Sequence, residues 1–157
     1  MTDDTKNVFI SHIHEDDEGL GKLKDLLNKN GRTIRDYSIN KDNPNKAKSE
    51  DYIKSQILAP RIDQSSVMIV YITPDTKGST YVDWEIEYAH TKDKRIVGVW
   101  AWGEKDCKLP AALEKFYDAV VGWSGGNIID AIDGKIDGFE NPDGTPRGPR
   151  PIKRHPC

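Results

Sequence analysis

The run VMIVYIT at residues 67–73 constrains the fold of this chain more than any other segment. It is apolar on both of the faces that a strand presents, and it is rich in β-branched residues. Strands of this kind occur in parallel sheets, where helices cover both faces. The run therefore predicts a central strand of an α/β domain.

Further strands and helices are predicted to alternate along the chain on both sides of this run. The predicted strands are 7–11, 33–39, 67–73, 95–103 and 120–123. The first predicted helix carries leucines at helical spacing over 20–27, and the second starts at 49–51 and is kinked or ended by Pro60. The third begins with a capping box of Thr80 and Asp83. Two more helices are predicted at 110–119 and 127–132. This alternation indicates a flavodoxin-like, doubly wound sheet of five parallel strands in the order 2-1-3-4-5, with helices on both faces.

One domain accounts for most of the 157 residues. We place this domain at residues 7–135, after a polar N-terminal tail at 1–6. The last stretch, 136–157, is rich in proline and glycine. We expect it to hold no regular structure.

Composition and charge argue against several classes of protein. The net charge is −3, whereas a surface that binds nucleic acid is usually basic. No apolar run approaches the roughly 20 residues that a membrane span needs, and the polar start MTDDTKN is no secretory signal. Cys107 and Cys157 are too few for a disulfide framework or a zinc site. We therefore expect a soluble cytoplasmic protein that binds neither nucleic acid nor a membrane.

The predicted topology also indicates where a ligand would bind. Ligands of an open α/β sheet bind beyond the carboxyl ends of its strands, at the point where the strand order reverses. In the predicted order this point lies between the first and third strands, where residues 11–17, the loop from Asp36 onward and residues 74–85 should meet. We expect Ser11 and His12 to line this crevice.

The segment SHIHEDD at residues 11–17 is also compatible with a metal site. His12, His14 and Asp16 have the spacing with which many binuclear zinc hydrolases begin. A zinc site needs three or four protein ligands, however, and only His90 and His155 remain as further imidazoles. In the simpler interpretation, the acidic residues cap a helix and His14 faces solvent. We predict no metal site.

Three other classes of protein lack their required residues in this chain. The pair Asp16 and Asp17 resembles that of phospho-receiver domains, but Thr73-Pro74 ends the third strand where the phospho-accepting Asp belongs, and the Lys after the fifth strand is missing. No P-loop and no GxGxxG motif follows a strand. ATP hydrolysis and hydride transfer are therefore not predicted.

The segment STYVDWEIEYA at residues 79–89 carries the most informative acid, Glu85. Residues three and four apart are neighbours on a helix, so Tyr81, Glu85 and Tyr88 share one stripe beside the predicted core stripe of Val82, Ile86 and Ala89. Glu85 should therefore border the core, where its hydrogen bonds gain strength. The alternative is a surface glutamate paired with a lysine. Glu87, on the opposite face of the same helix, should lie in solvent.

These segments together resemble a TIR domain. The resemblance rests on NVFISH in the first strand, the polar loop after RDYSI, the pattern S-x-x-x-x-x-E-I in STYVDWEI and the late GW pair, over about residues 7–132. VFISH with DWEIEYA resembles more closely the TIR-like proteins of Thoeris anti-phage defence, the ThsB group. The resemblance implies a flavodoxin-like fold and cleavage of NAD⁺ at the nicotinamide–ribose bond. It further implies a cyclic or otherwise modified ADP-ribose messenger, made upon infection, that activates a partner effector.

The resemblance also assigns roles to individual residues. It implies that Glu85 is the catalytic glutamate and that Ser79, six residues earlier, is its matching serine. The implied substrate-binding residues are Phe9, Ser11 and His12 at the end of the first strand, Asp36, Tyr37 and Ser38 at the start of the loop that covers the substrate, and Ser79, Tyr81 and Trp84 around the catalytic helix. NAD⁺ is the substrate, and no separate cofactor is implied. The chain departs from many TIR enzymes after the first strand, where Ile13 and His14 replace basic residues.

The chemistry of NAD⁺ cleavage suits a single carboxylate. Loss of nicotinamide leaves an oxocarbenium-like ribose, a positive charge that carboxylates stabilise in glycoside hydrolysis. Nicotinamide is already cationic and needs no general acid to depart, and Phe9 or Trp84 could stack on a base. The alternative is a non-catalytic interaction module, in which the loop at 40–51 and exposed aromatic residues support self-association. A homo-oligomer or a phage protein is the expected trigger of an enzyme of this kind.

Overall fold

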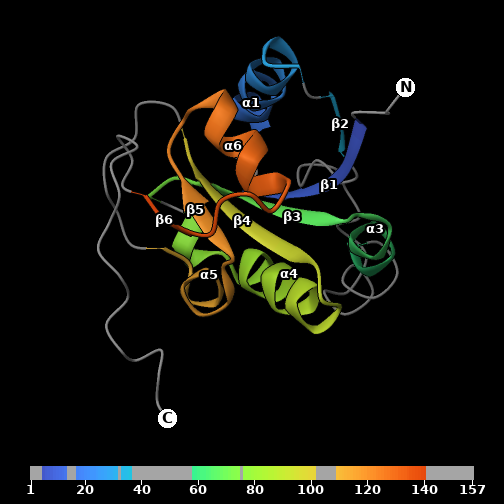
Figure 1. Cartoon of the computed structure of the whole chain (residues 1–157). Coiled ribbons are helices and arrows are strands. Elements are labelled where there is room, and N and C mark those ends of the chain that lie inside the picture. The colour runs from blue at the N-terminus through green and yellow to red at the C-terminus, as the bar shows by residue number, and fades with distance from the viewer. Residues whose placement is uncertain are drawn as a thin grey trace.

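The computed structural model describes residues 5–13, 17–31, 33–36, 58–74, 76–101 and 109–140. A single parallel sheet with the strand order β2-β1-β3-β4-β5-β6 runs through the centre of the molecule (Figure 1). Its strands are β1 (Thr5–Ser11), β2 (Thr33–Asp36), β3 (Val67–Ile72), β4 (Arg95–Trp100), β5 (Ala119–Val121) and β6 (Gly138–Phe139). The helices are α1 (Asp17–Lys29), α3 (Ala59–Gln64), α4 (Thr80–Thr91), α5 (Ala111–Phe116) and α6 (Gly125–Ile132), with a 3-10 turn at Thr76–Gly78.

The predicted order of the first five strands is confirmed, and so are the helices on both faces. Within the described residues the sheet has six strands instead of the predicted five, because β6 pairs in parallel with β5 through Gly138 and Phe139. The expectation that the stretch from residue 136 onward holds no regular structure is therefore wrong at this strand. The division into tail, domain and tail stays a prediction, and residues 141–157 lie outside the described residues.

The helices cover the two faces of the sheet with separate cores. In Figure 1, α1 and α6 lie on one face, and α3, α4 and α5 lie on the other. On the first face Leu20, Leu23 and Leu27 of α1 are buried against Val8 and Ile10, as the helical spacing of the leucines predicts. On the second face Val82, Ile86 and Ala89 of α4 are buried with Phe9, Met68, Val70 and Ile72. All six residues of β3 are buried, which is the reason for the apolar run in the sequence.

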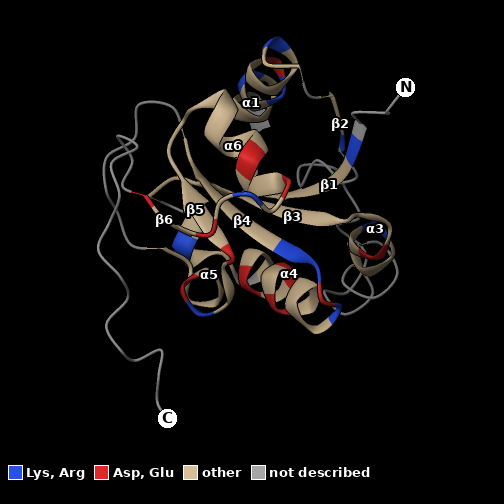
Figure 2. Ribbon diagram, in the orientation of Figure 1, with Lys and Arg blue, Asp and Glu red and all other residues tan. Residues whose placement is uncertain are grey.

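Charged residues lie mainly on helices and loops, and the central strands are largely without them (Figure 2). None of the helices in the described part of the chain is long and apolar enough to cross a membrane. Among the described residues there is also no cluster of three His, Cys, Asp or Glu side chains that could hold a metal ion. His14, Asp16 and His155 of the zinc alternative lie outside these residues.

One predicted helix boundary needs correction, and another stays a prediction. Pro60 stands in the first turn of α3, where its missing N–H is tolerated. The predicted helix from 49–51 that Pro60 would kink or end lies outside the described residues, so its end at Pro60 stays a prediction. The N-cap of α4 is Ser79 and not Thr80, because the Ser79 hydroxyl accepts a hydrogen bond from the Val82 N–H at 3.1 Å. Asp83, the second half of the predicted capping box, instead accepts from the Ala112 N–H at the start of α5, at 3.2 Å.

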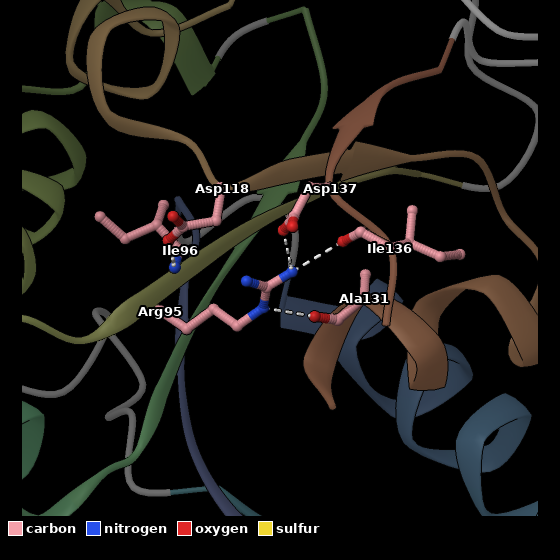
Figure 3. A network of polar contacts seen from close by, with 6 residues as sticks. All are labelled: Arg95, Ile96, Asp118, Ala131, Ile136 and Asp137. Atoms are coloured by element: carbon pink, nitrogen blue, oxygen red, sulfur yellow. Dashed lines mark hydrogen bonds and ion pairs between the residues drawn. The ribbon is translucent and has the colours of Figure 1, made fainter. Parts of the chain in front are cut away.

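An arginine at the start of β4 fastens the segment between α6 and β6. The Arg95 guanidinium donates to the carbonyl oxygens of Ala131 at 2.6 Å and Ile136 at 2.7 Å, and to the Asp137 carboxylate at 2.9 Å (Figure 3). The neighbouring Asp118 carboxylate accepts from the Ile96 N–H at 2.8 Å. Arg95 thus holds the chain that leads into β6 against the sheet.

Glu140 fastens the same segment at the other end of β6. Its carboxylate accepts hydrogen bonds from the Gly122 N–H at 2.9 Å and from the Asn127 amide at 3.1 Å. Its backbone carbonyl accepts from the indole N–H of Trp100 at 2.9 Å. With both ends held by side chains, a two-residue strand can pair at the edge of the sheet even though its sequence is poor in strand formers.

Candidate active site

The candidate site forms where β1 ends and α4 begins. Ser11 is the last residue of β1 and lies opposite Val70 of the adjacent strand β3, so both strands deliver their carboxyl ends to the same edge of the sheet. The chain leaves β3, makes the 3-10 turn and enters α4, which carries Glu85 back over this edge. This is the switch-point position at which α/β sheets bind ligands.

Glu85 is held at this edge by a hydrogen bond from β1. The Ser11 hydroxyl donates to Oε1 of Glu85 at 2.7 Å, and neither residue exposes any of its surface. The second carboxylate oxygen, Oε2, is buried as well. A side chain buried this completely can meet a ligand only after its surroundings rearrange. Glu85 is thus deeper than the predicted position at the border of the core, whereas Glu87 is exposed as predicted.

His12 follows directly and is also buried, with 1% of its surface exposed. Its Nδ1 lies 2.8 Å from the backbone carbonyl oxygen of Ile10. A carbonyl oxygen can only accept, so Nδ1 carries the proton, and in the neutral ring Nε2 then presents a lone pair. Ser11 and His12 are both buried beside the switch point, and their predicted place in the lining of a ligand crevice stays a prediction.

The turn between β3 and α4 is fixed by two buried threonines. The Thr76 hydroxyl accepts from the Thr73 N–H at 2.9 Å and donates to the Tyr71 carbonyl at 3.2 Å. The Ser79 N–H then donates to the Thr76 carbonyl at 3.1 Å, and the Ser79 hydroxyl caps α4. Capping uses a lone pair of the Ser79 hydroxyl, so the hydroxyl hydrogen is the part of this side chain that suits a substrate contact.

An aromatic stack on the partly exposed side of α4 orients Trp84. The rings of Trp84 and Tyr88 are stacked with centroids 5.2 Å apart and planes at 17°. The Tyr88 hydroxyl donates to Asp63 Oδ1 at 2.9 Å, and Lys92 Nζ lies 5.5 Å from the centre of the Tyr88 ring. Partial burial, and then the hydrogen bond to the Asp63 carboxylate, raise the pKa of Tyr88 above its ordinary value. A base that stacks on Trp84 must use the indole face opposite Tyr88.

Other predicted site residues are placed differently or lie outside the described residues. Phe9 exposes none of its side chain and packs in the core beneath α4, so its ring cannot stack on a base in this arrangement. Tyr81 is half-buried against the same core. Asp36 ends β2 opposite Val8, but its side chain is not described. Tyr37, Ser38 and the loop at 40–51 lie outside the described residues.

The hydrogen bond between Ser11 and Glu85 was missed by sequence reasoning. A signal for it existed: Ser11 lies two residues after the core residue Phe9, so both side chains point to the face of the sheet that α4 covers. The sequence alone did not show how α4 is placed over the sheet, with Glu85 above the last residue of β1.

Comparison with known proteins identifies the family. The family described as "Thoeris protein ThsB, TIR-like domain" matches residues 9–106, which is more than half of the chain. The chain belongs to the ThsB family of TIR-like domains. Among proteins with curated descriptions, none matches the sequence of this TIR-like domain.

Solved structures similar to this TIR-like domain include three from different settings. The TIR domain of the Toll-related receptor TRR-2 from Hydra magnipapillata is 19% identical, with a TM-score of 0.49, over 74% of this chain and 82% of that chain. The CMP N-glycosidase BcmB of Clostridium botulinum is 18% identical, with a TM-score of 0.42, over 60% and 71%. The TIR domains of the activated Roq1 resistosome, which recognises the pathogen effector XopQ, are 24% identical, with a TM-score of 0.42, over 60% and 57%.

Proposed function

We propose that this TIR-like domain is an enzyme that cleaves NAD⁺ at the nicotinamide–ribose bond. The observation that carries the proposal is the buried carboxylate of Glu85, held by Ser11 at the carboxyl edge of the sheet within a ThsB-family domain. Carboxylates buried in a protein interior interact more strongly with a positive charge than carboxylates in water. Such a group suits the cation that forms on the ribose.

The bond that breaks joins C1′ of the ribose to the pyridinium nitrogen. Its electron pair leaves with the nicotinamide, which departs as a neutral molecule, and the ribose becomes an oxocarbenium-like cation. Glu85 stabilises this cation and accepts hydrogen bonds from the ribose hydroxyls. Attack by water gives ADP-ribose, and attack by a purine nitrogen or a ribose hydroxyl gives a cyclic product. Water or a hydroxyl loses its proton to solvent when it attacks, whereas a purine ring nitrogen attacks with its lone pair and the positive charge passes from the ribose to the purine.

The surrounding residues supply binding contacts in this proposal. The Ser79 hydroxyl donates its hydrogen to the substrate while its lone pair caps α4. The Trp84 indole stacks on a base by the face opposite Tyr88. Ser11, His12 and Tyr81 line the same edge, and Asp36, Tyr37 and Ser38 complete the site from the loop after β2. Phe9 supports the site from the core beneath α4.

The product is proposed to act as a signal. A cyclic or modified ADP-ribose, formed in the cytoplasm during phage infection, would activate a separate effector protein. Assembly into a homo-oligomer or contact with a phage protein would be the trigger. Support for these finer points comes from the family to which the domain belongs.

The test compares Glu85→Gln with Glu87→Gln, which removes the same charge from the exposed face of the same helix. NAD⁺ and its products are measured by mass spectrometry in the purified protein and in extracts of phage-infected cells that express it. We expect NAD⁺ loss with wild type and with Glu87→Gln, and none with Glu85→Gln. If Glu85→Gln loses NAD⁺ as fast as wild type, or if no variant consumes NAD⁺ in either setting, the proposed activity is refuted. Retained defence in cells carrying Glu85→Gln would favour the interaction module instead.

A further inference from the structure

We propose that Ser11 is a positioning residue for Glu85, which sets the orientation of the carboxylate on which turnover depends. The inference rests on the proposed function and deepens it. Its starting point is the 2.7 Å hydrogen bond between the Ser11 hydroxyl and Oε1 of Glu85, in which both partners are fully buried and 74 positions apart in the sequence.

The donor stands on a rigid part of the fold. β1 is an inner strand that pairs with β2 on one side and with β3 on the other. Ser11 itself pairs with Val70, and the preceding residues Phe9 and Ile10 are fully buried in the cores on opposite faces. A serine side chain has only one torsion angle that places its oxygen. The backbone of β1 therefore fixes the position of the donor to a narrow range.

The acceptor, in contrast, has freedom that must be removed. A glutamate side chain has three torsion angles, and those of Glu85 begin on α4, a different element from the one that holds the donor. A hydrogen bond to one oxygen fixes the end of the side chain and hence the direction of the other oxygen. Groups fixed before the reaction need no reorganisation as charge develops, which is the basis of electrostatic catalysis. Loss of the Ser11 hydroxyl should therefore reduce turnover, because it removes the hydrogen bond that Oε1 of Glu85 accepts from β1 and loosens the end of the glutamate side chain.

Ser65 provides a matched control for packing. It is also buried, with 3% of its surface exposed, and its hydroxyl donates one hydrogen bond, to the Arg61 carbonyl at 3.0 Å. It lies at the end of α3, and its described hydrogen bonds go to α3. Ser65→Ala thus removes a buried serine hydroxyl without touching the pair of Ser11 and Glu85.

The experiment measures kcat and KM for NAD⁺ cleavage under the conditions in which wild type is active. For Ser11→Ala we expect kcat to fall about 10- to 100-fold, as for the loss of a hydrogen bond to a charged group, with KM changed less than about threefold. Ser11→Thr, which keeps the hydroxyl, should recover most of the activity. Ser11→Cys, a nearly isosteric and weaker donor, should lie between wild type and Ser11→Ala, and urea unfolding verifies that each variant is folded.

The results distinguish the positioning role of Ser11 from the proposed NAD⁺-cleaving activity. If Glu85→Gln is inactive but Ser11→Ala has the kcat of wild type, the positioning role is refuted and the proposed function stands. A loss of kcat in Ser11→Ala that Ser65→Ala matches and that Ser11→Thr does not recover would show a general effect of packing and would likewise refute the positioning role. If Glu85→Gln retains full activity, the proposed function fails first and the inference fails with it.

Discussion

The hydrogen bonds of Arg95 allow one prediction in which the size of the effect follows from the structure. Arg95→Met keeps the aliphatic stem of the side chain and removes the guanidinium with its bonds to Ala131, Ile136 and Asp137. Hydrogen bonds to a charged group contribute about 1.5–3 kcal/mol when they are well buried. The Arg95 side chain is 22% exposed, so we take about 1–1.5 kcal/mol for each bond to a carbonyl. The Asp137 side chain is 70% exposed, which leaves less than about 1 kcal/mol for the ion pair.

The free energy of unfolding of Arg95→Met should therefore fall by about 2–4 kcal/mol, a large part of the roughly 5–15 kcal/mol of an ordinary domain. Arg95→Lys lacks the planar guanidinium that reaches both carbonyl oxygens, so its free energy of unfolding should fall by about half as much as that of Arg95→Met. Asp137→Asn should change stability by less than about 1 kcal/mol. Urea unfolding followed by tryptophan fluorescence and circular dichroism gives all three values. Equal stability of Arg95→Met and wild type, or an equal loss in Asp137→Asn, would refute the reasoning. Arg95 begins β4, at the edge opposite Glu85, so the folded variant should cleave NAD⁺ with unchanged KM.

Two further predictions concern glycine packing and the cap of α4. A Cβ added at Gly19 of α1 would meet the Tyr71 ring and hydroxyl, whereas one at Gly21 of the same helix meets nothing within 4 Å. Gly19→Ala should therefore lower the free energy of unfolding by about 1–3 kcal/mol. Gly21→Ala should raise it by roughly 0.5–1 kcal/mol, because alanine has the higher helix propensity. Urea unfolding measures both values, and a Gly19→Ala variant more stable than wild type would contradict the reasoning. Ser79→Ala should cost about 1 kcal/mol through loss of the N-cap, and Ser79→Asp should restore this stability. Because the Ser79 hydroxyl is also proposed to donate to the substrate, Ser79→Asp should remain impaired in NAD⁺ turnover. Normal turnover in Ser79→Asp would show that Ser79 caps α4 and does not contact the substrate.

The sequence predicts the layers of the fold well because they depend on local patterns. The run at 67–73 is buried at both faces of β3, and the leucines of α1 repeat at the helical period, so each pattern directly reports the burial that causes it. Strand ends are less well predicted: β4 ends at Trp100 and β5 at Val121, two to three residues before the predicted limits. Hydrophobic patterns do not mark where pairing stops, because buried residues continue beyond the last ladder bond.

The features that the sequence did not predict depend on contacts between distant segments. The strand β6 exists because Arg95 and Glu140 hold its two ends, and neither residue carries a local signal for this role. The capping box was assigned one residue too late because Ser79 and Thr80 are both favoured N-cap residues, and the acid at Asp83 has the capping-box spacing from Thr80. Phe9 was expected to line the substrate site from a family resemblance and was one of two candidates to stack on a base, whereas its position within β1 directs its ring into the core.

The separation of Ser11 and Glu85 along the chain has a consequence for how the protein is made. The donor is synthesised first, and the acceptor follows 74 positions later, with β2 and β3 between them. A chain whose synthesis has not yet reached Glu85 contains the donor without the acceptor. A chain cut by a protease between the two positions has lost the covalent link between them, and the pair separates when the fragments dissociate. Because turnover is proposed to need both residues in contact, copies without the assembled pair do not deplete the NAD⁺ of the cell that makes them. Only the completely folded domain consumes it.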